Sequence, residues 1–426
     1  SHGKNVSTKH LGLAAADEVA GEKNLASSSP CARLLGFSSF LSKPSFPSMS
    51  LKTAMTVVAL SAVVSVNAAE KPLWVYLGSY AKGPEQGITL CELDRSSGKL
   101  EKKKVFGGHV NPSFLEIHPS KKFLYAVNEI GSYEGEKAGS VTAFSIDPKT
   151  GDLKELNRLS TRGGAPCHVS IDASGKFLFV ANYTGGSVIS YRIGKDGRLK
   201  EASFVQHEGT SVDPRRQKGP HGHSINPDPA NKRAYAADLG LDKVLVYEIT
   251  KSGKLKPNDP PFAKTQAGGG PRHLDFHPSG MFAYVNLEMT SKVSVFAHDA
   301  ETGSLKEIQT LSTLPKEGKP GNSTAEMRVH PSGKFVYCSN RGHDSIAVFS
   351  VDGMTGKLTF VEREPTGGKT PRNFCIAPSG DYLLAANQNS GNVVVFRVNA
   401  ETGALSPTGH SIETPKCVCV RFLERS

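Results

Sequence analysis

The sequence lacks the patterns on which several classes of hydrolase depend. It has seven cysteines, but no C-x-x-C pair and no histidine at the spacing of a zinc ligand. No G-x-S-x-G elbow occurs in a strand-to-helix context, which disfavours a serine hydrolase. Carboxylates are not clustered at metal-ligand spacing, which argues against metal-dependent hydrolysis. We therefore expect no metal and no cofactor.

Other absences limit the partners. The formal net charge is +11, but the basic residues are spread along the chain and form no stripe with interleaved aromatic residues. Nucleic-acid binding needs such a stripe, so we expect no nucleic-acid partner and only a weak preference for anionic small molecules. No apolar run approaches the roughly 20 residues that span a bilayer. We expect no stable membrane insertion, and a monomer.

The N-terminal part of the sequence differs in character from the rest. Residues 1–48 are rich in Ser, Ala and Gly, and we interpret them as disordered or as an extension upstream of the native start. Met49–Ala69 is typical of a secretory signal, because the basic Lys52 precedes an apolar run, Met55–Val66, and small residues follow it. We expect export to the periplasm or the medium. A retained N-terminal anchor is the alternative, and the protein is cytoplasmic if the signal is not used.

The cysteines that follow this segment lie mostly in apolar strand patterns; they are Cys91, Cys167, Cys338, Cys375, Cys417 and Cys419. Buried free thiols are the simplest interpretation, because such cysteines act as small hydrophobic residues. Spacing alone identifies no disulfide.

A self-similar unit recurs roughly every 50 residues, a period typical of propeller blades. Weaker copies begin at Pro112 and Pro220, and the clear copies are Pro166–Leu199, Pro271–Leu305, Thr324–Leu358 and Pro371–Leu405. Each copy alternates short strand patterns with turns rich in Gly, Ser and Asn, and no segment has helical periodicity. The sequence therefore predicts an all-β, seven-bladed β-propeller over residues 70–426.

The two ends of the repeat supply the seventh blade. Trp74–Tyr80 and Gly87–Leu93 resemble second and third strands that lack a first strand, whereas Lys416–Leu423 resembles a first strand that lacks the others. Pairing these segments closes the ring with a clasp of N- and C-terminal strands in blade one. Such closure leaves no open sheet edge.

Alignment of the units shows which residues face one mouth of the central channel. The starts of the first strands form an entrance column, with a second column beside it, and the residues after the second strands form an exit column. The entrance column reads Ser113, Cys167, His221, Arg272, Ala325 and Arg372. Its neighbour reads Phe114, His168, Gly222, His273, Glu326 and Asn373. The exit column reads Glu129, Tyr183, Leu239, Glu288, Arg341 and Gln388.

The residues just before the exit column are more uniform. They are Asn128, Asn182, Asp238, Leu287, Asn340 and Asn387. Asn and Asp at such places commonly bond local backbone, so this pattern favours a structural role. The entrance and exit columns instead differ between blades and bring His, Arg and Glu to one mouth. Convergence of titratable groups in a concave place indicates a functional site.

Several ordered motifs carry a family resemblance. Arg216–Ser224, Gly270–His273, Asn322–Glu326, Ser339–Ser345 and Pro371-Arg372 together resemble the seven-bladed β-propeller lactonases. That family includes propeller-type 6-phosphogluconolactonases and the carboxymuconate lactonizing enzyme. The resemblance extends from about Trp74 to Phe422.

The resemblance implies a metal-independent site in which a His and a Glu handle protons and arginines bind an anionic substrate. It assigns the catalytic roles to His221 or His223, Arg272, Glu288 and Arg341. The substrate-binding candidates are His168, Arg216, His273, Glu326, Asn340 and Arg372. One departure is that Asn286-Leu287-Glu288 stands where many relatives have Val-Asn-Glu, so the acid is kept but its neighbour is not.

The residue types suit hydrolysis of a lactone. The reaction needs a base for water, an acid for the leaving alkoxide and positive charge at the oxyanion. Histidine can serve as base and then as acid, and arginine binds carboxylate or phosphate with two donors. Glu288 would orient the histidine or act as the base. A structural ion pair between Glu288 and Arg341, and a packed channel histidine, are the alternatives.

Two functions follow from these patterns. The first is an exported lactonase that hydrolyses a sugar-acid lactone, phosphorylated or not. The second is a non-catalytic propeller that serves as a binding or interaction scaffold, since propellers have many unrelated roles. The His, Arg and Glu residues at one mouth favour the first.

Overall fold

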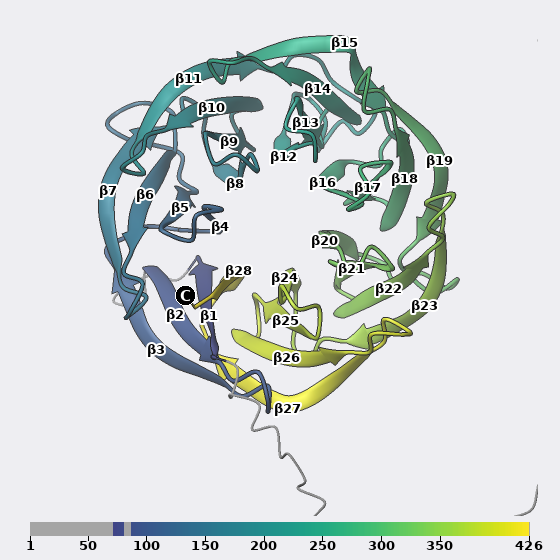
Figure 1. The fold of residues 1–426 in the computed structure, drawn as a ribbon. Coiled ribbons are helices and arrows are strands. Elements are labelled where there is room, and N and C mark those ends of the chain that lie inside the picture. Colours follow the sequence, from purple (N-terminus) through teal and green to yellow (C-terminus); the bar gives the residue numbers. More distant parts are fainter. Residues whose placement is uncertain (1–70, 81–86, 426) are drawn as a thin grey trace, which may run out of the picture. The chain divides into compact units, whose positions relative to one another are not determined.

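In the computed structural model, which describes residues 71–80 and 87–425, the chain folds into seven four-stranded antiparallel sheets. The predicted extension (1–48) and signal segment (49–69) lie outside the described residues. The sheets stand as blades around a central axis (Figure 1). This confirms the predicted seven-bladed β-propeller.

Each blade places its strands at equivalent distances from the channel. The inner strands are β28 (Cys417–Glu424), β4 (Phe114–Ile117), β8 (Pro166–Ile171), β12 (Gly222–Pro227), β16 (Pro271–Phe276), β20 (Ser323–Val329) and β24 (Pro371–Ile376). The second strands are β1 (Leu73–Ser79), β5 (Phe123–Asn128), β9 (Phe177–Asn182), β13 (Arg233–Asp238), β17 (Phe282–Leu287), β21 (Phe335–Arg341) and β25 (Tyr382–Asn387). The third strands are β2 (Gly87–Leu93), β6 (Ser140–Ile146), β10 (Ser187–Ile193), β14 (Lys243–Ile249), β18 (Lys292–His298), β22 (Ser345–Val351) and β26 (Asn392–Val398). The outer strands are β3 (Leu100–Gly107), β7 (Leu153–Ser160), β11 (Leu199–Gln206), β15 (Leu255–Lys264), β19 (Leu305–Ser312), β23 (Leu358–Pro365) and β27 (Leu405–Glu413).

Blade one joins the two ends of the chain. Its strand order is β28-β1-β2-β3, and β28 pairs with β1 from Leu73 opposite Glu424 to Ser79 opposite Cys417. The C-terminal strand therefore forms the inner edge of a blade whose other strands come from the N-terminal side. The predicted clasp is confirmed.

The core lies between the faces of neighbouring blades. Second strands are buried on both faces, as in β1, whereas outer strands such as β3 are mostly exposed. This explains why the second strands have nearly continuous apolar sequences, while the outer strands are polar. In six blades a tyrosine on the second strand also donates a hydrogen bond to a turn carbonyl of the next blade; they are Tyr76, Tyr125, Tyr235, Tyr284, Tyr337 and Tyr382.

Blade three is the exception to this tyrosine contact. Phe179 occupies the equivalent position on β9 and has no hydroxyl group. The hydroxyl of Ser190, on the adjacent strand β10, donates to the carbonyl of Gly253 in blade four at 2.7 Å. A side chain from a neighbouring strand thus supplies the hydrogen bond that the phenylalanine cannot make.

The inner strands begin with an irregularity that matters for the site. In blades three to seven the pairing between the inner and second strands shifts register at the first residues of the inner strand. Such bulges interrupt the alternation of side chains along a strand and redirect them. Blade one shifts at the equivalent place, between Gly78 and Ser79. At these bulges, consecutive residues of the inner strand can therefore both point into the channel, which strict alternation along the strand would not allow.

Two other predictions concern the described residues. The six cysteines after the signal segment are free thiols, and all but the half-buried Cys375 are buried. Within 71–80 and 87–425, no helix has the length and hydropathy needed to cross a membrane.

Candidate active site

The bulges define the entrance column and correct one alignment. Gly222 faces Asp238 across blade four, as Pro271 faces Leu287 across blade five. His223, and not His221, is therefore equivalent to Arg272. The sequence alignment was wrong by two residues in this blade because it matched Pro220 to the prolines that begin the other inner strands.

The exit column is fixed by one repeated backbone bond. The amide of Glu288 donates to the carbonyl of Gly270 at 2.8 Å, and that of Glu129 donates to Asn111 at 2.9 Å. The same bond forms at Tyr80, Tyr183, Leu239 and Gln388. In five of these corners the accepting residue has a left-handed φ between 45° and 65°; these residues are Asn111, Ala165, Gly270, Thr370 and Lys416. The corners hold the exit residues at the channel mouth.

A polar pocket lies at this mouth. Its lining combines entrance and exit residues from several blades: Glu129, Cys167, Tyr183, Arg216, His223, Glu288, Arg341 and Arg372. A smaller pocket shares Glu129, Cys167 and Arg372 with it and adds Tyr80, Ser113, Phe114, Arg272, His273, Asn373 and Val418. The described residues that line the two pockets include four arginines and two glutamates, so the site has a formal excess of positive charge.

Glu288 is the centre of an arginine cluster. Its Oε1 accepts a hydrogen bond from Arg216 at 2.8 Å, and its Oε2 accepts from Nε of Arg272 at 3.0 Å. Arg341 lies 3.0 Å from the same Oε2. The side chain of Glu288 is only 8% exposed. The acid therefore has direct support from three arginines, although its preceding neighbour is Leu287.

The electrostatics of the cluster follow from this packing. Burial raises the pKa of the Glu288 carboxyl, but Arg341 and Arg272 outweigh burial and hold that pKa well below its ordinary value. Burial lowers the pKa of Arg341 to about 10, with Glu288 opposing the shift. Both groups stay charged at neutral pH. A carboxylate held in this way is a weak proton acceptor.

His223 is the histidine that faces Glu288. Its Nε2 lies 3.9 Å from Oε2 of Glu288, and its side chain is buried. Burial, followed by the charge of Arg272, lowers the pKa of His223 well below its ordinary value. The imidazole is therefore neutral at pH 7 and has a nitrogen available to accept a proton.

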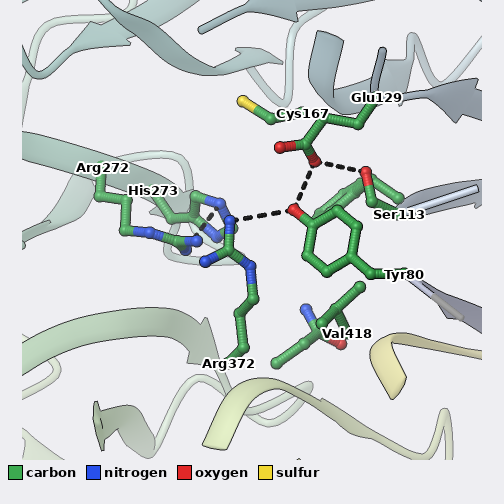
Figure 2. A pocket seen from close by; sticks show the side chains of 10 residues that line it. Tyr80, Ser113, Glu129, Cys167, Arg272, His273, Arg372 and Val418 are labelled. Atoms are coloured by element: carbon green, nitrogen blue, oxygen red, sulfur yellow. Dashed lines mark hydrogen bonds between the residues drawn. The ribbon is translucent and has the colours of Figure 1, made fainter. Parts of the chain in front are cut away.

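The smaller pocket contains a second carboxylate in a different setting (Figure 2). Oε2 of Glu129 accepts hydrogen bonds from the hydroxyls of Tyr80 and Ser113, both at 2.6 Å. Arg372 donates to the Tyr80 hydroxyl at 3.2 Å rather than to the carboxylate. The carboxylate of Glu129 is therefore held by two neutral hydroxyl groups, whereas that of Glu288 is held by three charged arginines.

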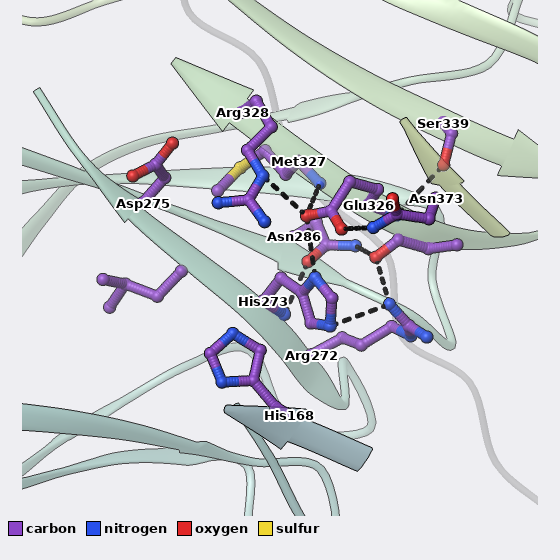
Figure 3. Close-up of polar contacts among 12 residues, drawn as sticks. His168, Arg272, His273, Asp275, Asn286, Glu326, Met327, Arg328, Ser339 and Asn373 are labelled. Atoms are coloured by element: carbon purple, nitrogen blue, oxygen red, sulfur yellow. Dashed lines mark hydrogen bonds and ion pairs between the residues drawn. The ribbon is translucent and has the colours of Figure 1, made fainter. Parts of the chain in front are cut away.

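A buried chain of polar side chains lies beneath Arg272 (Figure 3). Arg272 contacts Nε2 of His273 at 3.1 Å, and Nδ1 of His273 contacts Oε1 of Glu326 at 2.8 Å. Asn373 also bonds Glu326, and Arg328 lies 3.3 Å from it. These contacts connect the site to the interior of the channel.

The structure brings most predicted residues together but not all. His221 does not line either pocket; its ring stacks on Tyr183 with centroids 4.7 Å apart. His168 and Glu326 are buried and line neither pocket. Asn340 is fully buried and bonds Thr313, so its position fits the structural role expected of the Asn residues and not the predicted contact with substrate.

Eight lining residues were not among the predicted site residues: Tyr80, Ser113, Phe114, Glu129, Cys167, Tyr183, Asn373 and Val418. All but Tyr80 and Val418 stand in the entrance column, the column beside it or the exit column, so their positions could have identified them even though their residue types did not. Tyr80 occupies the exit corner of blade one. Because that blade is split between the ends of the chain, its exit residue is absent from the alignment. Among the described residues, no three His, Cys, Asp or Glu side chains are grouped to hold a metal ion.

Comparison with known proteins identifies the family. The family model "Lactonase, 7-bladed beta-propeller" matches residues 74–422. A 6-phosphogluconolactonase of Bacillus subtilis is 35% identical over 351 residues, which is 82% of this chain and 98% of the relative. The solved periplasmic gluconolactonase of Pseudomonas aeruginosa is 33% identical, with a TM-score of 0.78 over 84% of this chain and 100% of that one. The chain therefore belongs to the seven-bladed β-propeller lactonase family and is an enzyme of the lactonase type.

Proposed function

We propose that the protein hydrolyses the ester bond of a sugar-acid lactone at the pocket around Glu288. The observation that supports this most directly is a neutral, buried His223 beside a carboxylate that gathers three arginines. The names of the Bacillus and Pseudomonas relatives support the substrate class.

In this proposal His223 accepts a proton from the attacking water. The carbonyl carbon becomes tetrahedral, and the nearby guanidinium groups stabilise its oxyanion. The carbon–oxygen bond of the ring then breaks, and protonated His223 returns the proton to the leaving alkoxide. Glu288 has a lowered pKa and three arginine partners, so we assign it the role of positioning Arg272, Arg341 and Arg216.

Arg372 is the arginine best placed to bind the anionic part of a substrate. Its hydrogen bond within the described part of the chain goes to the Tyr80 hydroxyl, and its side chain lines both pockets. Arg216 is 43% exposed at the rim and can meet the same group. Whether the bound anion is a carboxylate or a phosphate is decided by comparing lactones with and without a phosphate.

We also propose that the enzyme is exported. The pattern of Met49–Ala69 supports this, and the Pseudomonas relative is described as periplasmic. Export would favour an unphosphorylated substrate, because phosphorylated sugars are mainly cytosolic metabolites.

A matched pair of histidine variants tests the catalytic proposal. His223→Gln should lower kcat on D-glucono-1,5-lactone by about 10²- to 10⁴-fold, the usual cost of losing a positioned base. His221→Gln, two residues away and outside both pockets, should stay close to the parent. A chelator should change none of these rates. If the parent hydrolyses no lactone in a panel, the scaffold function replaces this proposal.

A further inference from the structure

Among the described residues that line the two pockets, Glu129 is the one carboxylate that neither the mechanism nor the arginine cluster uses. Its amide donates to the carbonyl of Asn111 at 2.9 Å, and the Asn111 side chain donates back to the Glu129 carbonyl at 3.1 Å. Its backbone is thus held on both sides. The side chain projects from this fixed corner into the space shared by the two pockets.

The two oxygens of Glu129 have different surroundings. Oε2 accepts hydrogen bonds from Tyr80 and Ser113, and these two donors fix the plane of the carboxylate. Oε1 has no hydrogen bond to any described residue, and Figure 2 shows it directed away from both hydroxyls. A carboxylate oxygen has room for further donors, so this atom is presented to a ligand.

The charge around Glu129 also differs from that around Glu288. No arginine or lysine of the described residues lies within ion-pair distance of Glu129, whereas three arginines contact Glu288. Arg372 interacts electrostatically with Glu129, but it donates its hydrogen bond to the Tyr80 hydroxyl and not to the carboxylate. A carboxylate without a direct ion pair accepts a hydrogen bond from a neutral hydroxyl and repels a carboxylate or phosphate placed against it. Oε1 of Glu129 is therefore a hydroxyl-binding atom in a pocket whose arginines, Arg216, Arg341 and Arg372, are available for the anionic part of a substrate.

From this arrangement we propose that Glu129 determines substrate specificity: its Oε1 accepts a hydrogen bond from a ring hydroxyl of the lactone and excludes substrates that carry a carboxylate there. This inference rests on the proposed lactonase function and adds a residue and an orientation to it. The bound lactone lies with its anionic or carbonyl side toward the arginines and its hydroxylated side toward blade two.

The experiment compares substrates that differ in their hydroxyl groups. Glu129→Gln should lower kcat/KM on D-glucono-1,5-lactone by about 10- to 100-fold, the effect of losing one hydrogen bond to a charged group. The same variant should change kcat/KM on δ-valerolactone, which has the ring but no hydroxyls, by less than about 3-fold. An equal loss on both substrates, or no loss on either, would overturn the proposal.

A binding measurement separates this inference from the proposed function. Calorimetric titration with D-gluconate, and with hexanoate as the control that lacks hydroxyls, needs no turnover. Glu129→Gln should weaken gluconate binding alone by about 10- to 100-fold. Parent protein that binds gluconate but hydrolyses no lactone would refute only the lactonase function, whereas unchanged gluconate binding in the variant would refute only the role of Glu129.

A second variant keeps the test decisive if Glu129→Gln does not fold. The double variant Tyr80→Phe/Ser113→Ala keeps the carboxylate but removes the donors that orient it. It should lose about 3- to 10-fold in kcat/KM on the hydroxylated lactone, with little change on δ-valerolactone. Thermal melts of each variant establish that it is folded, and the absence of this substrate difference would contradict the proposal.

Discussion

Nδ1 of His273 lies 2.8 Å from Oε1 of Glu326, and this contact fixes the proton on the imidazole ring. The guanidinium of Arg272 can only donate, so Nε2 of His273 accepts its hydrogen bond and Nδ1 carries the hydrogen. Burial lowers the pKa of His273 well below its ordinary value, which keeps this neutral form. A buried carboxylate thus orients the arginine that in turn holds Glu288.

Variants of His273 test whether this chain positions Arg272. His273→Leu removes both contacts, and we expect kcat to fall by up to about 100-fold, the cost of misplacing a group in an active site by an ångström. His273→Gln can still donate to Glu326 and accept from Arg272, so it should recover most of the rate. Steady-state kinetics on both variants provide the measurement. Equal rates in the two variants would mean that His273 only fills space.

The pH dependence of activity should report His223. A base must be unprotonated to act, so activity is lost as the pH falls through its pKa. Because burial and Arg272 lower that pKa below 6.5, kcat/KM should stay constant from pH 8 through 6.5 and decline only at lower pH. A pH–rate profile between pH 4.5 and 8 checks this. An acidic limb centred above pH 7 would assign the base to another group.

Stability should also decrease in mild acid. His168, His223 and His273 are buried with pKa values lowered by burial. The unfolded chain therefore binds more protons than the folded one below about pH 6.5, and the free energy of unfolding falls as the pH drops toward the lowered values. Each histidine contributes at most about 1.4 kcal/mol per pH unit. Urea unfolding at pH 7 and 5.5 measures how steeply the free energy of unfolding depends on pH. His168→Gln should reduce this dependence by the contribution of one histidine.

The clasp should be essential for the ring. Deleting residues 416–426 removes β28 and exposes the surface of blade one and its neighbours that Val418, Val420 and Leu423 cover. At about 1.5–3 kcal/mol for each buried apolar side chain, the loss should be roughly 5 kcal/mol or more. Deleting only residues 425–426, which removes the ion pair between Arg425 and Glu92, should cost under about 1 kcal/mol. Indistinguishable melting of the two truncated proteins would refute a stabilising clasp.

The proposed export predicts where the mature chain begins. Protein recovered from its native host should begin near Ala69 or Glu70, because small residues end the signal segment there. N-terminal sequencing of the periplasmic or secreted fraction gives the answer. Unprocessed protein in the cytosolic fraction would instead support a cytoplasmic lactonase with a phosphorylated substrate.

The sequence predicted the ring because every blade repeats the same turns, and it predicted the clasp because the unmatched strands at the two ends are complementary. It also placed Arg272 and Glu288 at one mouth, where they lie 3.0 Å apart. It could not choose between His221 and His223, because Pro220 stands two residues before the position that Pro271 occupies in blade five, and only the pairing of Gly222 with Asp238 reveals this offset. The register of pairing depends on both strands, so it cannot be predicted from the sequence of one strand alone.

The repeated corner that holds the exit residues has a consequence for how such a site can change. The corner is made by the amide of the exit residue and the carbonyl of a left-handed neighbour, as at Glu129 and Asn111. The side chain of the exit residue takes no part in that bond, so Tyr, Glu or Gln can occupy it without altering the backbone. Architecture and chemistry are thus encoded by different atoms of the same residue, and a propeller of this kind can acquire a new substrate one blade at a time.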